Sequence, residues 1–514
     1  MEAAMEAEYN PQVGPVRVDV VIIGSGMAGA AVAYTLLEEW YACGYNGTLT
    51  VLEQKVVCGG ATSKTGNATT LMPWKVYSTL KKKHGAKNAQ DVVYSQELGV
   101  QMLMEVIQNE GMIDFGRVQG DNQSILFDPD ASTRLAKELY GHETDTNAAN
   151  LEKVDDKTLF VSQKSFIKAK IMVETLKKEV PGFENRITVY GAAVARARYS
   201  TTQICYGAIE YQALVLKPHH FVRRLFTRLQ DRHLGFALQT NTQVLEIKSP
   251  PPEDKEGFHE VTFLRYYGDA SFMQMTGGEV DDLNVLQPTQ ETIFARHIVH
   301  ANNPSDDSKP LIPAITAHLV QSRGVVSVQL TTGPLTERLD YAKKSSVLTV
   351  IDGQYYITAS RSIGLGESQQ GVTFLSGCES RKPHPAPTTE HMRALWSDLF
   401  RQEFFTTDAI PIQSTTSGTK DRLPFVGRVP WGLIPGSQPM QWYHPSMWMA
   451  LGFGDNGLVM AWLSGTAVAL MLLDPDDVLH NQRRRPGRPA PPLRDWFPSV
   501  LYLSQQRFLR LSKS

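Results

Sequence analysis

The chain has 514 residues, of which 42% are hydrophobic and 20% are charged, and its formal net charge at pH 7 is −2. This length exceeds the usual single domain of about 100–200 residues, so we expect two interleaved or sequential domains around a large core. A charge so close to neutral provides no basic field for nucleic acid or for an anionic membrane, and we expect neither as a partner. The four cysteines are isolated in sequence, so neither a zinc site nor a disulfide framework is predicted, and no metal is expected.

The N-terminal residues 1–17 read as a loose tail that contains acids and prolines. They lack the apolar stretch of a secretory signal, so the expected location is the cytoplasm. The last three residues, Ser512-Lys513-Ser514, resemble the Ser-Lys-Leu peroxisomal address without matching it. A peroxisomal location is therefore kept as the alternative.

The first regular segment combines a strand, a glycine turn and the start of a helix. The apolar run Val20–Ile23 predicts a buried strand, and it leads into the G-x-G-x-x-G pattern Gly24-Ser25-Gly26-Met27-Ala28-Gly29. In such a turn Gly24 permits the sharp bend, Gly26 lets a pyrophosphate approach the backbone, and Gly29 lets the helix pack closely. Met27 and Ala28 open the helix, whose N-terminal N–H groups favour an anion.

A second strand, Leu49–Leu52, ends in Glu53, which lies 24 residues after Gly29. This is near the roughly 20 residues of the dinucleotide fingerprint, in which the carboxylate accepts the hydroxyls of a ribose. An unphosphorylated ribose, hence FAD or NAD rather than NADP, is favoured because a carboxylate repels a 2′-phosphate. Gln54 is grouped with Glu53 as a cofactor-binding residue. The competing interpretation is a surface glutamate after an ordinary strand.

The rest of the chain shows two kinds of pattern. Buried-strand and helix patterns predict a discontinuous Rossmann-like domain that consists of residues 18–84, 165–250, 292–320 and 410–475. A strand pair over 235–247 belongs to this domain. Alternating apolar residues near 325–331, 347–351, 355–359 and 372–376 predict an antiparallel sheet in a second, α+β substrate domain of residues 85–164 and 321–409. The predicted fold class is therefore α/β with two domains.

The C-terminal part contains one long apolar run, from Trp448 to Leu473. Polar residues and glycines interrupt its start, and the remaining helix of about 458–473 is shorter than the ~20 residues that a bilayer requires. We predict a glycine loop followed by a buried helix, and no membrane span. Residues 476–514 are predicted as a C-terminal linker and helix, in which the basic, proline-rich run Arg483–Pro489 reads as a solvated linker.

Four blocks in order resemble the D-amino-acid oxidase-like family of FAD-dependent oxidoreductases, which contains glycine, sarcosine and D-amino-acid oxidases and dehydrogenases. These blocks are Gly24 to Gly29 with Glu53, Gly59 to Asn67, the strand pair around Val244, and Thr419 to Gly427 followed by Leu451 to Met460. The first block is common to many enzymes, whereas the last two together are much more specific. The resemblance implies FAD as the cofactor.

The resemblance also implies roles for individual residues. Gly60, Ala61, Thr62 and Ser63 would pass under the pyrophosphate and against the flavin ring, and Asn67 would reach the ring or a substrate. The backbone of Val244 would pair with the adenine edge. Charge that develops at flavin N1 and the C2 carbonyl would be stabilised by a loop and helix start that comprise Gly452, Gly454, Asn456, Gly457 and Leu458. An ordinary polar turn, an ordinary strand residue and a purely structural loop are the competing interpretations.

Two departures from the family matter. The stretches Gly59 to Thr70 and Ser417 to Pro424 contain no histidine or cysteine for a covalent flavin link, so we expect non-covalent FAD. The strand Val372–Leu375 offers no lysine for oxygen activation. The electron acceptor is therefore oxygen or another carrier, and Lys420 is the candidate substitute, with an exposed lysine as the alternative.

The resemblance implies hydride transfer from an amine-bearing carbon of a small amine or amino acid to flavin N5, which gives an imine. A substrate carboxylate needs a bidentate arginine, for which Arg361 is the first candidate and Arg422 the second. Two other functions remain open: an NAD(P)H-dependent FAD monooxygenase or other flavin oxidoreductase, and a non-catalytic FAD-binding protein. No second glycine fingerprint for a nicotinamide cofactor is seen.

Overall fold

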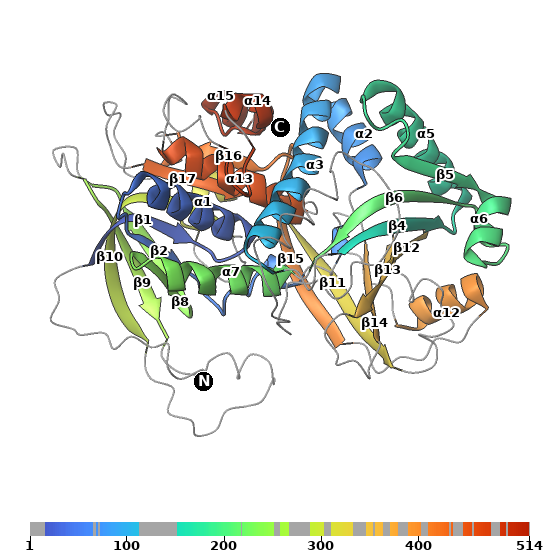
Figure 1. Cartoon of the computed structure of the whole chain (residues 1–514), viewed down its shortest axis with the longest axis horizontal. Helices are drawn as coiled ribbons and strands as arrows, with labels where there is room; N and C mark the ends of the chain where they lie inside the picture. Colours follow the sequence, from blue (N-terminus) through green and yellow to red (C-terminus); the bar gives the residue numbers. More distant parts are fainter. Residues whose placement is uncertain are drawn as a thin grey trace.

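A computed structural model gives the fold of the chain (Figure 1). It describes residues 16–64, 68–69, 72–112, 152–216, 218–250, 257–266, 288–302, 310–332, 346–352, 355–362, 371–378, 389–401, 410–430, 433–434, 446–454, 457–473, 484–489 and 492–512. Within these residues two large sheets lie next to each other, one at the left and one at the right of Figure 1.

The first sheet contains a parallel centre. Its strands follow the order β16 (Phe425–Arg428), β17 (Ser446–Leu451), β10 (Thr289–His300), β1 (Val16–Ile23), β2 (Leu49–Leu52) and β7 (Phe236–Gln239). All neighbours from β17 to β7 pair in parallel, and β16 pairs antiparallel with β17. The antiparallel pair β8 (Thr242–Lys248) and β9 (His259–Arg265) joins this sheet at β10. The predicted Rossmann-like half of the α/β fold is confirmed.

From Val20 to Ile23, strand β1 is apolar and buried at every position because both faces of the sheet are covered. Val20 and Ile22 belong to the core that contains α1 (Met27–Cys43) and α13 (Gly457–Leu473). Val21 and Ile23 belong to a second core on the opposite face. A strand that is buried on both sides needs a continuous apolar run, and this is the pattern that the sequence shows.

Helices α1 and α13 pack against each other on the first sheet (Figure 1). Their contact depends on Gly465, because a Cβ atom there would lie 2.4 Å from the carbonyl oxygen of Ala28. The predicted buried helix after the glycine loop is confirmed as α13. None of the helices in the described part of the chain is both long and apolar enough to cross a bilayer.

The second sheet is largely antiparallel. Its strands follow the order β15 (Ile410–Thr419), β11 (Leu319–Thr332), β14 (Gly371–Cys378), β13 (Tyr355–Ser362), β12 (Ser346–Asp352), β4 (Glu152–Phe160), β6 (Gly207–Val215) and β3 (Ala68–Thr69), with β5 (Ile187–Gly191) beside β6. The pair of β12 and β4 is parallel, and the other pairs are antiparallel. The predicted antiparallel sheet is confirmed.

Four strands belong to a different sheet from the one that their predicted ranges suggest. Strand β3 lies within residues 18–84, β5 and β6 lie within 165–250, and β15 lies within 410–475, yet all four pair in the second sheet. Strand β6 pairs with β3, β4 and β5, and β15 pairs with β11. Strand composition does not specify a distant partner. The domain ranges themselves stay a prediction.

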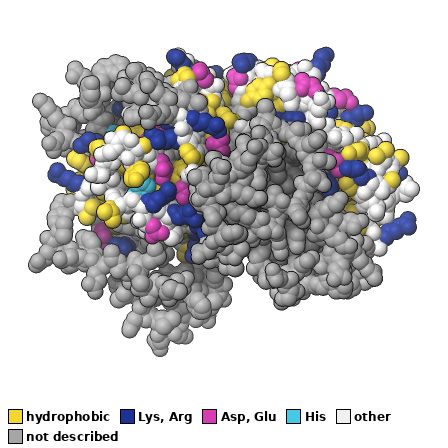
Figure 2. Space-filling view, viewed as in Figure 1, with side chains coloured by type: hydrophobic (Ala, Val, Ile, Leu, Met, Phe, Trp, Pro, Cys, Tyr) yellow, Lys and Arg dark blue, Asp and Glu magenta, His cyan; other side chains and the backbone are white. Residues whose placement is uncertain are grey.

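The remaining helices surround the two sheets. Helices α2 and α3 pack against each other, α2 also contacts α5, α3 contacts α13, and α7 packs on α1 (Figure 1). These and the short helices are α2 (Pro73–His84), α3 (Ala86–Asn109), α5 (Gln163–Glu179), α6 (Ala192–Tyr199), α7 (Pro218–Arg232), α9 (Pro313–Thr316), α12 (Thr389–Phe400), α14 (Leu493–Trp496), α15 (Gln505–Ser512), η1 (Ala61–Lys64) and η5 (Ser499–Leu501). Figure 2 shows Lys and Arg side chains dispersed over the visible face with Asp and Glu between them, as the net charge suggests.

The predicted solvated linker at 483–489 is wrong for residues 487–489, which are buried, and for half-buried Arg485, whereas Arg484 and Pro486 are exposed. Arg488 is 3% exposed, and its Nε and that of Arg485 donate to the same Oε1 of Glu39, at 2.8 and 2.9 Å. The indole of Trp462 donates to the carbonyl of Gly487 at 2.9 Å. Glu39 lies on α1 and is 5% exposed, and a buried carboxylate needs cationic partners. The basic run supplies them, so it docks onto the core.

Candidate functional site

The turn between β1 and α1 has the geometry of a nucleotide-binding turn. Gly24 has φ +104°, which favours glycine, and its N–H donates to the carbonyl of Leu52 at 2.9 Å. A Cβ at Gly29 would lie 2.1 Å from the carbonyl oxygen of Gly24, so the helix start excludes any side chain there. At Gly26 an added Cβ would meet only Thr62 Oγ1, at 3.1 Å. The backbone therefore stays open to a ligand at the one glycine where the fingerprint requires it.

Glu53 is buried at the end of β2 and is fixed by the same turn. Its Oε2 accepts the N–H and the hydroxyl of Ser25, at 2.8 and 2.6 Å, and its Oε1 accepts the N–H of Lys55 at 3.0 Å. Each carboxylate oxygen can accept two hydrogen bonds, so Oε1 retains capacity for a ribose hydroxyl. Gln54 is the exposed residue that follows. Ser25 thus orients the carboxylate, a role that the sequence reasoning missed although Ser25 lies inside the glycine pattern.

Cys58 lies beside this carboxylate. Its N–H donates to Ser25 Oγ at 2.7 Å, and its side chain is buried. Burial, together with the charge of Glu53, raises the pKa of the thiol to about 12. Since the thiolate is the nucleophilic form, this cysteine is unreactive at neutral pH.

The segment after Gly60 lies over the start of α1. Thr62, in η1, accepts the N–H of Met27 through its Oγ1 at 3.3 Å, and Gly26 carries no side-chain cap of its own. Gly60 is exposed, and no atom would lie within 4 Å of a Cβ there. Ala61 and Ser63 belong to η1, which also contacts β15. The segment that is predicted to pass under the pyrophosphate therefore lies next to β15 of the second sheet.

The glycine loop before α13 packs on the end of β15. Gly452 and Gly454 both have positive φ, +79° and +59°. A Cβ at Gly452 would lie 2.9 Å from Cγ2 of Thr419, and Gly418 forms a bridge with Phe453. Gly457 and Leu458 open α13. The positive φ angles of Gly452 and Gly454, and the close approach of Thr419 to Gly452, favour glycine at these two positions.

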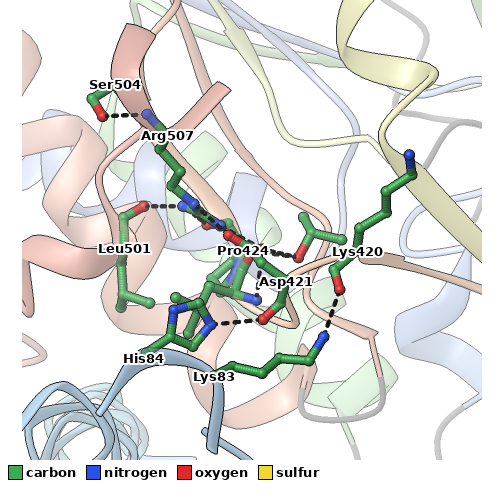
Figure 3. Close-up of polar contacts among 10 residues, drawn as sticks. Lys83, His84, Lys420, Asp421, Pro424, Leu501, Ser504 and Arg507 are labelled. Atoms are coloured by element: carbon green, nitrogen blue, oxygen red, sulfur yellow. Dashed lines mark hydrogen bonds and ion pairs between the residues drawn. The ribbon is translucent and has the colours of Figure 1, made fainter. Parts of the chain in front are cut away.

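The turn that follows β15 is fastened from two sides (Figure 3). Lys83 Nζ donates to the carbonyl of Lys420 at 2.9 Å, and His84 Nε2 lies 2.8 Å from the carbonyl of Asp421, both at the end of α2. On the other side Arg507 of α15 forms a double ion pair with the Asp421 carboxylate, at 2.9 and 3.1 Å. Burial opposes ionisation of Asp421, but the hydrogen bonds and charge of Arg507 outweigh it and lower the pKa of this carboxyl.

The structure places the remaining predicted residues as follows. Val244 is half-buried in β8 opposite Phe263. Lys420 is exposed at the first position of the turn, and Arg422, also exposed, has φ +69°. Arg361 lies in β13 opposite Val372. Asn67 and Asn456 lie outside the described residues.

Sequence reasoning also missed Gln239 and Arg507. Gln239 lies at the carboxyl end of β7, next to Glu53, whose N–H donates to the Gln239 carbonyl at 2.8 Å. Its buried side-chain Oε1 has no hydrogen-bond partner among the described residues. Ligands of open α/β sheets bind outside the carboxyl ends of the strands, so the place of Gln239 at the end of a predicted strand could have identified it as a ligand contact. No feature of the sequence indicated a role for Arg507, because a sequence does not distinguish a buried arginine from a surface arginine.

These residues fit an FAD cofactor. The open backbone at Gly26, the carboxylate of Glu53 and the unpartnered oxygen of Gln239 follow one another along the carboxyl edge of the first sheet. Such an edge takes a dinucleotide, with its pyrophosphate at the helix start and its ribose at the acid. Among the described residues no group of His, Cys, Asp and Glu side chains gathers as a metal ion would require.

Residues 19–471 match the DAO family, described as FAD dependent oxidoreductase. The match covers most of the chain, so the protein belongs to this family and is an FAD-dependent oxidoreductase, as the resemblance implied. No curated protein sequence matches the chain.

Solved structures share the fold at low sequence identity. The glycine oxidase of Geobacillus kaustophilus is 14% identical with a TM-score of 0.55, and the alignment covers 94% of this chain and 99% of that one. A variant of NikD, an unusual amino acid oxidase essential for nikkomycin biosynthesis, is 12% identical with a TM-score of 0.55, over 94% and 97% of the two chains. The L-amino acid deaminase of Proteus vulgaris, without its specific insertion, is 11% identical with a TM-score of 0.53, over 91% and 92%. These likenesses confirm the fold.

Proposed function

We propose that this protein oxidises a C–N bond of a small amine or amino acid, or of an amine-bearing metabolic intermediate. One observation carries the proposal: the end of β15, in the second sheet, meets η1 and the glycine loop before α13 beside the nucleotide turn. A substrate held on the second sheet would therefore lie next to the cofactor site. The names of the glycine oxidase, the deaminase and NikD, all of which concern amino acids, support the substrate class.

The chain holds the cofactor through residues already described. Gly26 and Thr62 would face the pyrophosphate, Glu53 a ribose, and the backbone of Val244 the adenine. The loop Gly452–Gly457 and the start of α13 would face the flavin ring, where N–H groups stabilise negative charge. Bound FAD would supply the acceptor for the hydride that leaves the amine-bearing carbon. The nitrogen also loses a proton, so that the substrate becomes an imine, which water hydrolyses to a carbonyl with release of the amine.

The second sheet would orient the substrate. Arg361 of β13 is the proposed partner of a substrate carboxylate, because a guanidinium pairs with a carboxylate through two hydrogen bonds. Arg422 is the second candidate. Asn67 is the proposed contact to the ring or the substrate, and exposed Lys420 is the proposed aid to an oxygen acceptor. The acceptor is oxygen or another carrier, and the proposed location is the cytoplasm, with the peroxisome as the alternative.

FAD is proposed to be non-covalent. The two stretches that carry the link in other members of the family contain no histidine or cysteine. Among the described residues Cys58 lies beside the glycine turn, and burial raises the pKa of its thiol, which disfavours the nucleophilic thiolate.

Anaerobic reduction of the bound flavin tests this function. Purified holoprotein is titrated in separate experiments with D-amino acids, N-methyl amino acids and secondary amines, with glycerol 3-phosphate as a C–O control and NADPH as a further control. Bleaching of the flavin by an amine, without NADPH, is the expected result. Bleaching by NADPH alone would favour the monooxygenase alternative, and an unreactive flavin would favour the non-catalytic one, so either result would overturn amine oxidation.

A further inference from the structure

Among the described residues, Arg507 is the buried cation with the most hydrogen bonds that has no role in the predicted site. It lies on α15 and is 5% exposed. Its guanidinium donates to Asp421 Oδ2 and Oδ1, at 2.9 and 3.1 Å, and to the carbonyls of Pro424, Leu423 and Leu501, at 2.8, 2.5 and 3.0 Å (Figure 3). It also lies 5.0 Å from the ring centre of Phe425. Four of these partners belong to one short turn, residues 421–425.

The conformation of this turn requires contacts from another element. Arg422 has φ +69°, a region that costs a non-glycine residue about 1–2 kcal/mol. A strained backbone persists when its surroundings over-determine it. The Asp421 carboxylate contributes by accepting the Thr419 hydroxyl at 2.8 Å and the Leu423 N–H at 3.3 Å, and Arg507 holds that carboxylate in place.

Thr419 connects the turn to the glycine loop. Its side chain is completely buried, its hydroxyl also lies 2.6 Å from the Leu423 carbonyl, and its Cγ2 is the atom nearest to a Cβ built at Gly452. Gly418, its neighbour, bridges Phe453 and lies against Gly454. A displacement of the turn therefore moves the packing surface of the loop that leads into α13.

We propose that Arg507 is a positioning residue for the flavin end of the cofactor site: through Asp421 and Thr419 it fixes the loop 452–454. The C-terminal helix, which the family match at 19–471 does not include, thereby becomes part of the cofactor site's support. The inference rests on the proposed function in one respect, namely that the loop before α13 faces the flavin.

Point variants in the full-length protein test this role. Arg507→Met keeps the length of the side chain and removes all its hydrogen bonds, whereas Arg507→Lys keeps the charge alone. Arg510→Met is the matched control on the exposed side of the same helix. Arg488→Met is a second control, because it breaks a buried arginine–glutamate pair at α1, away from this turn. For each variant, three quantities are measured: the FAD dissociation constant of deflavinated protein, the flavin midpoint potential under chemical reduction, and the Tm of the apoprotein.

We expect Arg507→Met to raise the FAD dissociation constant about tenfold or more and to shift the midpoint potential, with partial recovery in Arg507→Lys. Arg510→Met should match the wild type. Arg488→Met should lower the Tm of the apoprotein while the dissociation constant stays within about twofold. The inference is overturned if Arg507→Met changes the dissociation constant and the potential no more than Arg488→Met does. If Arg507→Met does not fold, Asp421→Asn is measured in its place, with the same expected direction and the same contrary result.

Gly454→Ala separates this inference from the proposed function. Gly454 has φ +59°, a conformation that alanine rarely adopts, so the substitution would strain the loop directly, although the added methyl would lie in ordinary contact, 3.7 Å from the Cα of Gly418. If Gly454→Ala leaves the dissociation constant and the potential unchanged, the loop does not face the flavin and the proposed placement fails. If Gly454→Ala changes both and Arg507→Met changes neither, only the positioning role fails. Chemical reduction makes these outcomes independent of the substrate.

Discussion

Two turns meet at the candidate site, and they are held by different means. The turn after β1 is shaped by glycines and by Glu53, which is 28 residues from its partner Ser25. The turn after β15 depends on Arg507, which lies 86 residues beyond Asp421. In the first turn, the space at Gly29 admits only glycine. The second turn is instead held by the charge and hydrogen bonds of Arg507, which lies on helix α15. With the roles proposed above, one ligand site would combine a locally encoded part with a part that a distant helix, α15, supplies.

The largest effect is expected where the C-terminal segment meets the core. Glu39→Gln leaves Arg488 buried without its carboxylate, and removal of one partner from a buried ion pair costs about 3–5 kcal/mol. The free energy of unfolding in urea measures this loss. The control is Glu174→Gln on α5, which breaks an exposed pair with Lys170 and should change the free energy by less than about 0.5 kcal/mol. Equal effects of the two variants would show that the C-terminal contact does not stabilise the core.

The glycine turn should respond to added volume almost as strongly. In Gly29→Ala the new methyl group meets the Gly24 carbonyl oxygen at 2.1 Å, so backbone must move, and we expect a loss of about 2–3 kcal/mol. Gly191→Ala is the matched control, because a Cβ there meets nothing within 4 Å. Its stability should stay within about 0.5 kcal/mol of the wild type. A tolerated Gly29→Ala would contradict the close packing of α1 on its turn.

His300 provides a test of the first sheet that depends on pH. It ends β10, and burial, with the nearby His259, lowers its pKa from 6.5 to about 4. The unfolded chain therefore binds a proton at a higher pH than the folded protein, so stability falls as the pH drops from 6.5 toward 4. Between pH 6.5 and 5 this contribution is about 2 kcal/mol. Urea unfolding of His300→Gln across this range should show a correspondingly shallower loss, and an unchanged slope would argue against a buried neutral histidine.

The last predicted effect concerns the cofactor rather than the fold. Glu53→Gln removes the negative charge but keeps the shape of the side chain, and a hydrogen bond to a charged group contributes about 1.5–3 kcal/mol. FAD should therefore bind about tenfold to a hundredfold more weakly in a fluorescence titration of the apoprotein. Glu246→Gln, on the exposed face of β8, serves as the control and should bind like the wild type. An unchanged affinity in Glu53→Gln would refute the ribose assignment.

The sequence allowed the local parts of this architecture to be predicted. The run Val20–Ile23, the three glycines and Glu53 indicate a strand, a turn and an acid, because each feature depends on neighbours in the sequence or on a fixed spacing. The alternation in 347–351 and 372–376 indicates strands for the same reason, and β12 and β14 confirm them.

Parts that depend on distant partners were not predictable. The apolar residues of β6 do not reveal that the strand pairs with β4 rather than with the first sheet. The run Arg483–Pro489 has the composition of a solvated linker, and the burial of Arg488 follows from a single glutamate, Glu39, more than 400 residues earlier. For Arg507, likewise, only the fold shows that its partner is Asp421.

The absorption spectrum of the purified protein, before and after acid precipitation, tests the central claim most directly. The account predicts a flavin spectrum in the native protein and release of FAD to the supernatant, because the chain belongs to the FAD-dependent family and burial raises the pKa of the Cys58 thiol beside the glycine turn. A colourless protein that takes up no FAD would contradict the assignment of the glycine turn as the cofactor site. A flavin that stays with the precipitate would contradict the proposed non-covalent binding.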